Sequence, residues 1–273
     1  MKELLAIEWL KVKKYTAFKV LAICFIIGVI ATNYIVYSFN KNVVSNVPAG
    51  GLISFSPYSF DSTWQTTSYV TGFILLLPSL LLLMLFTNEY SYKTHRQNII
   101  DGWSRQQFID VKFMMGFIFA LIATVMVALT ALLFGLGSGT SFSIKGIEYL
   151  GYFFMKAFSY NLIAILISVL IKRTGFATGV FFIYLGAENI ISQMLDVLSM
   201  KIKSESGTDI GSIGDYLPMN AADGLLGFPN NSLKTMSKSI MPTDYTWIVF
   251  ALAIAYMFLF YFWAKRKFVQ SDL

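Results

Sequence analysis

The stretch FFMKAFSYNLIAILISVLIKRTGFATGVFFIYLGAENIISQM, residues 153–194, decides the fold. It holds two apolar blocks that are separated only by Lys172, Arg173 and Thr174. Each block is about as long as a helix that crosses a bilayer, which takes ~20 residues at about 1.5 Å per residue. Because so short a link forces an antiparallel hairpin, the stretch predicts a helical membrane protein.

Four further apolar blocks lie on either side of this hairpin. The six predicted spans are residues 18–37, 69–86, 113–136, 153–171, 175–194 and 245–263. The composition agrees, because 56% of the residues are hydrophobic and 13% are charged, and the mean hydropathy is +0.63. We expect an all-α integral membrane fold, with residues 1–273 as a single transmembrane domain.

Lysine and arginine indicate which side of the membrane each loop occupies, because cytoplasmic loops are enriched in them. With the amino terminus inside, most of these residues fall on one side. We therefore expect a multi-pass protein of the cell inner (plasma) membrane with both termini in the cytoplasm. A cytoplasmic loop is predicted at 87–112 and a large external loop at 195–244. Residues 1–15 mix Trp9 and leucines with lysines, which is typical of a helix at the membrane interface.

The cytoplasmic loop contains two short predicted helices around a bend at Asp101 and Gly102. Gly102 can close the first helix in a left-handed conformation, and Ser104 begins a capping box that starts the next. Three apolar side chains gather at the bend: Ile99, Ile100 and Trp103. Two readings stay open here. The cluster is a docking surface for a partner protein, or Trp103 anchors at the headgroups and the charges around it are solvated.

The loop also carries a family pattern. The residues that form it are Glu89, Thr94, Asn98, Gly102, Ser104, Arg105, Phe108 and Lys112. This arrangement resembles the cytoplasmic loop of type-2 ATP-binding-cassette exporter permeases. Lys93 stands where that family usually has Gly, and Trp103 stands where it usually has Pro.

The resemblance implies a permease subunit of an ATP-driven exporter whose loop inserts into a separate ATPase subunit as a coupling helix. ATP and Mg would then be bound by that partner, with no cofactor and no enzymatic activity in this chain. It also implies two ATPase copies and a second permease subunit, as a homodimer or a heterodimer. The expected coupling residues, with Trp103 and its neighbour Asp101 added from the loop itself, are Glu89, Thr94, Asn98, Asp101, Gly102, Trp103 and Arg105.

Polar or helix-breaking residues inside the apolar blocks suggest a substrate pathway: Pro78, Glu188 and Asn189. Pro78 predicts either a hinge or a tolerated kink in the second span. Glu188 is expected to face protein or water, with Lys156 as a candidate ion-pair partner, or to lie near the outer headgroups. Lys156 itself is expected to extend toward the outer surface.

Two glycines four residues apart, Gly175 and Gly179, form a GxxxG pattern that favours close helix packing, within the subunit or across a dimer.

Other functions find less support in the sequence. His95 is the single histidine and has no ligand-spaced neighbours, so no metal site is expected. No basic run has the character of a nucleic-acid groove. Two alternatives stay open: an intramembrane hydrolase or lipid-modifying protein, for which Asp215 is the candidate acid, and an ATPase-linked envelope component that exports no solute. A secondary transporter would show repeats and several midplane charges, which are lacking here. The transported substance is not determined by the sequence.

Overall fold

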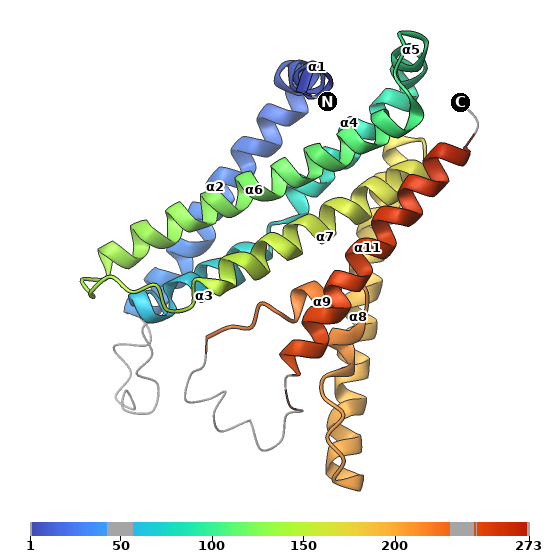
Figure 1. The fold of residues 1–273 in the computed structure, drawn as a ribbon. Coiled ribbons are helices and arrows are strands. Elements are labelled where there is room, and N and C mark those ends of the chain that lie inside the picture. The colour runs from blue at the N-terminus through green and yellow to red at the C-terminus, as the bar shows by residue number, and fades with distance from the viewer. Residues whose placement is uncertain (1, 43–56, 230–242, 244, 272–273) are drawn as a thin grey trace.

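The computed structural model describes residues 2–42, 57–229, 243 and 245–271 (Figure 1). Every regular element in these ranges is helical, as predicted. The elements are α1 Lys2–Lys14, α2 Thr16–Asn42, α3 Phe60–Gly72, α4 Leu76–Ser91, α5 Thr94–Ile100, α6 Arg105–Gly137, α7 Glu148–Leu170, α8 Thr174–Ser206, the 3-10 helix η2 Ile213–Tyr216, α9 Asn220–Asp223 and α11 Thr246–Gln270.

Five of these helices, α2, α6, α7, α8 and α11, are long and apolar enough to cross a membrane. A sixth span results if α3 and α4 are taken together, since they are joined with a bend of 45°. The chain is therefore a multi-pass membrane protein. One end of the bundle carries α1, α5 and the carboxyl end of α11, and we call it the basic end; the opposite, far end carries α9 (Figure 1).

The second predicted span is broken where a continuous helix was expected over 69–86. The helix stops at Gly72 and resumes at Leu76, which places Pro78 in the first turn of α4. Proline is tolerated there, because an N–H in the first turn has no partner within the helix, so its absence costs nothing; the carbonyl four residues earlier is that of Ile74. That carbonyl instead accepts a hydrogen bond from the N–H of Leu77 at 3.1 Å. The bend therefore precedes Pro78 and leaves no orphan carbonyl at Ile74.

Helix α7 is the centre of the bundle. In its most apolar stretch 78% of the residues are buried, against 17–33% in the other four single-helix spans, whose remaining faces are left to lipid. It lies between α6 and α11 (Figure 1). Asn161 joins it to its neighbours by donating to the carbonyl of Gly116 at 2.7 Å and accepting from Ser79 at 2.8 Å. Gly116 allows this approach, because a Cβ there would meet Asn161 and Leu82.

The first part of the predicted external loop, residues 195–206, is helical and continues α8 as far as Ser206. The reason is that this part has partners: Ser199 accepts a hydrogen bond from the N–H of Ile213, and Asp196 accepts one from the N–H of Gly214. After Gly207 the chain reverses, and η2 and α9 fold back against α8, α7 and α11. Residues 230–242 and 244 of this predicted loop lie outside the described residues.

Candidate functional site

The loop between α4 and α6 has the predicted form of a short helix and a bend. Helix α5 ends at Ile100, Gly102 adopts a φ of +102°, and Ser104 caps α6 through a reciprocal pair of hydrogen bonds with Gln107. Lys93, at the turn into α5, has a φ of +57°, a left-handed conformation that costs little only for glycine. The lysine therefore adopts a backbone conformation that favours glycine, the residue that the family pattern usually has at this position.

The side chains at the bend do not form the exposed cluster of Ile99, Ile100 and Trp103 that the sequence suggested. Trp103 is half-buried and packs on Phe108, with the Lys11 ammonium 5.9 Å from its ring centre. The exposed apolar side chains are instead Ile100, at 76%, and Tyr92, at 77%. Ile100, at the carboxyl end of α5, is thus the candidate contact residue of the loop, whereas Tyr92 precedes α5 and lines a cavity with Glu89.

The other predicted coupling residues mostly hold the loop in place. Arg105 donates to the carbonyls of Val269 and Ser271, both at 3.0 Å, so its guanidinium binds the carboxyl end of α11 and does not face outward. Thr94 lies 3.5 Å from the carbonyl of Glu89. Asp101 is exposed and accepts a hydrogen bond from Gln97, while Asn98 has a buried amide nitrogen without a partner among the described residues.

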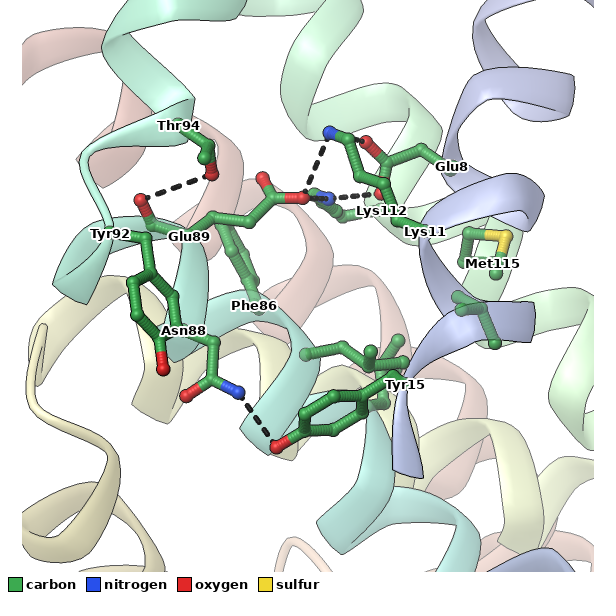
Figure 2. A pocket seen from close by; sticks show the side chains of 13 residues that line it. Glu8, Lys11, Tyr15, Phe86, Asn88, Glu89, Tyr92, Thr94, Lys112 and Met115 are labelled. Atoms are coloured by element: carbon green, nitrogen blue, oxygen red, sulfur yellow. Dashed lines mark hydrogen bonds and ion pairs between the residues drawn. The ribbon is translucent and has the colours of Figure 1, made fainter. Parts of the chain in front are cut away.

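Beneath the loop, four charged side chains from three helices form an ion cluster (Figure 2). Its members are Glu8 and Lys11 of α1, Glu89 of α4 and Lys112 of α6. The Lys112 ammonium binds both carboxylates, with 2.8 Å to Glu89, and Lys11 lies 2.8 Å from Glu8 and 3.2 Å from Glu89. Lys112 is 3% exposed and Glu8 4%. Charges this deeply buried persist only when paired, and the cluster contains two of each sign.

Burial raises the pKa of Glu8, but the ammonium groups of Lys112 and Lys11 outweigh this effect and hold the pKa below its ordinary value. Glu8 therefore stays ionised at neutral pH, and α1 stays attached to α4 and α6. Only Glu89 of this cluster was predicted as a site residue. Lys112 was part of the family pattern but was not assigned a role, and Glu8 and Lys11 were not singled out, because no local pattern links residues that are so far apart in the chain.

A cavity of about 160 Å³ lies beside the cluster, between α1, α4 and α6 (Figure 2). Its lining is charged or polar near Glu8 and Asn88 and apolar near Leu82 and Met115. Asn88 donates to the hydroxyl of Tyr15 at 2.7 Å and accepts from Thr174 at 3.1 Å, and so joins the start of α2 to α4 and α8. His95 adds a second tie, with Nδ1 3.0 Å from the carbonyl of Glu89.

The predicted pairing of Glu188 with Lys156 is wrong. Lys156 is only 8% exposed and does not extend outward; its ammonium lies 3.2 Å from Asp223. Glu188 is also buried and accepts hydrogen bonds from the N–H groups of Met219 and Asn220. Both partners belong to the segment that folds back after α8, which the sequence assigned to an external loop.

The remaining predicted residues lie on the exposed face of α8. Asn189 is exposed, and its amide donates to the carbonyl of Leu185. Gly175 and Gly179 have no described atom within 4 Å of the point where a Cβ would stand. The GxxxG pattern therefore does not pack against another described helix of this chain.

The described residues thus form a helical bundle with five or six candidate membrane spans and with ion pairs at both ends. The family model of the ABC-2 family transporter proteins matches residues 4–188, more than half of the chain. The chain belongs to this family, and it is a permease component of an ABC transporter. No curated protein and no solved structure matches it.

Proposed function

We propose that this permease couples ATP hydrolysis by a separate ATPase subunit to export across the membrane, with the basic end in the cytoplasm. The observation that carries the proposal is the exposed Ile100 at the carboxyl end of α5, in the loop between α4 and α6 and outside the apolar parts of the spans. Exposed apolar side chains surrounded by charges suit a protein contact, because buried anchors supply most of its energy. ATP and Mg would be bound by the partner.

The ion cluster gives this docking surface a firm base. Glu89 and Lys112 lie on the helices that enter and leave the loop, and Glu8 and Lys11 join both to α1. A push on α5 would therefore reach α4, α6 and α1 together, since Glu8, Glu89 and Lys112 cannot move apart without breaking a buried ion pair. We infer that this joint passes the motion of the ATPase to the spans.

The exposed face of α8 suits a second permease subunit. Gly175, Gly179 and Gly186 all leave open space where a Cβ would stand, and small residues let helices approach closely in a membrane. We propose two permeases packed along α8 with two ATPases, either as a homodimer or with a related chain.

Copurification tests the proposal. The full chain is expressed together with a candidate ABC ATPase subunit from the same genome, and the mass of the purified complex gives the stoichiometry. Ile100→Asp is expected to lower recovery of the ATPase at least about tenfold, as loss of a buried anchor worth ~1.4 kcal/mol or more. The control is Leu133→Ala, on an exposed face of α6. An aspartate at this position would put a charge into lipid, so alanine is used.

Recovery that stays unchanged in Ile100→Asp would contradict docking at this loop. Gln97→Cys, in a Cys24→Ser background, tests the orientation. We expect no reaction with a membrane-impermeant thiol reagent outside intact cells, and rapid labelling there would invert the topology.

A further inference from the structure

The chain after α8 returns into the far end of the bundle and is held there at both ends of α9. At its start, two backbone N–H groups donate to the buried carboxylate of Glu188. At its end, Asp223 lies 3.2 Å from the ammonium of Lys156 and accepts a hydrogen bond from Tyr160 at 3.0 Å. Helix α9 is thus fixed between charged side chains of α8 and α7.

These contacts lie within the thickness of the membrane. Lys156 is about 12 Å along α7 from its far end, and Glu188 is about 21 Å along α8 from the basic end, at 1.5 Å per residue. Since the apolar core is about 30 Å thick, both side chains would be costly without partners. The returning segment supplies these partners, so the charges and the segment depend on each other.

The segment covers the broken second span. A Cβ at Gly72, the last residue of α3, would stand 3.1 Å from the Lys156 ammonium and 3.8 Å from Leu226. Leu226 also packs in one apolar cluster with Ala157 and Leu75. Residues of the segment therefore close the bundle directly above the gap between α3 and α4.

The attachment is made of separate short contacts. Apart from the charged contacts of α9, the N–H groups of Ile213 and Gly214 donate to Ser199 and Asp196 of α8, Gln65 donates to the carbonyl of Gly227, and Tyr256 donates to that of Tyr216. Met219, Leu225 and Leu226 are buried in apolar clusters of the bundle. Ala221 adds a small apolar contact with Val249 and Ala253. Helix α9 itself has only four residues, so it gains little from its own hydrogen-bond ladder.

We propose that residues 213–228 form a removable external plug, with the Lys156–Asp223 ion pair as its latch. The proposal rests on the proposed function, because a transporter that exports a solute must open this end. Release of Asp223 frees the end of α9, and Leu226 then leaves the apolar cluster that contains Ala157. The opened space reaches from the far surface to the break between α3 and α4.

Cysteine accessibility in intact cells tests the plug. The full chain carries Cys24→Ser and the reporter Ala157→Cys, and labelling from outside with an impermeant maleimide is followed over time. Asp223→Asn is expected to speed labelling about tenfold, since it removes one polar contact within the membrane. Glu205→Gln is the matched control, because it makes the same change in an exposed pair with Lys201 and should leave the rate unchanged.

A second reporter separates opening from unfolding. Ala164→Cys lies on the same helix, fully buried and nearer the basic end, and should stay unlabelled in Asp223→Asn. The double variant Lys156→Gln/Asp223→Asn, which leaves no lone charge, should still label faster than the parent at residue 157. Equal rates in the parent and in Asp223→Asn, or equal labelling of both reporters, would overturn the plug. No ATPase is needed for this result, so it stands apart from the copurification test.

Discussion

The two ends of the bundle both bury charged side chains, but in different ways. At the basic end, the ion cluster joins Glu8, Lys11, Glu89 and Lys112, and all four lie on α1, α4 or α6, two of them close to the loop that these helices support. At the far end, the charges of α7 and α8 hold a short returning segment, partly through its backbone N–H groups. The first arrangement joins whole helices and suits a fixed joint. The second holds a piece that can leave without unfolding a span.

The largest effect is expected where the charges are most buried. Lys112→Met leaves Glu8 and Glu89 with only the half-exposed Lys11 between them, and should lower the free energy of unfolding by about 3–5 kcal/mol. The measurement is denaturant unfolding in detergent. The control is Lys265→Met, which breaks the Lys265–Asp110 pair of 2.8 Å whose side chains are 29% and 32% exposed, and should cost under about 1 kcal/mol. Similar losses in both variants would contradict a buried joint at the basic end.

Acid should loosen the basic end, and a change at Glu8 should remove that response. The pKa of Glu8 in the folded chain lies below its ordinary value of 4.5, because two ammonium groups face the carboxylate. The folded chain therefore binds this proton less tightly than the unfolded chain does, and each tenfold difference in proton affinity is worth about 1.4 kcal/mol. This contribution to stability is present above pH 4.5 and is lost as the pH falls through the pKa of the folded chain.

Hydrogen exchange of the α1 amides measures this response. Exchange should accelerate as the pH is lowered below about 4.5, after correction for the intrinsic rate. In Glu8→Gln the protection of α1 should be lower at neutral pH and independent of pH in this range. An equal acid response in the parent and in Glu8→Gln would show that another group holds α1 in place.

The smallest effect concerns the turn into α5. Lys93→Gly removes a left-handed non-glycine residue, which should raise the free energy of unfolding by about 0.5–1 kcal/mol, since glycine's own flexibility offsets part of the relief. Gly102→Ala is the opposite change, at a φ of +102° with open space around the Cβ, and should destabilise. A loss of stability in Lys93→Gly would mean that the lysine side chain contributes more than its backbone costs.

The sequence by itself determined the parts of this protein that depend on short stretches. About 20 apolar residues in a row identify a membrane span whatever surrounds them, because transfer into lipid is a property of the segment. The bend at Gly102 and the capping box at Ser104 were predicted for the same reason, since each involves residues within one turn of the helix.

The tertiary structure alone decided which distant side chains meet. Lys112 pairs with Glu8, 104 residues away, and Asp223 with Lys156, and no periodicity relates these positions. The packing of residues 207–229 against the bundle also depends on contacts between residues that are far apart in the sequence. The sequence of this stretch is that of a polar loop. It packs into the bundle because the buried Glu188 and Lys156 need polar partners, and this stretch supplies them in the folded chain.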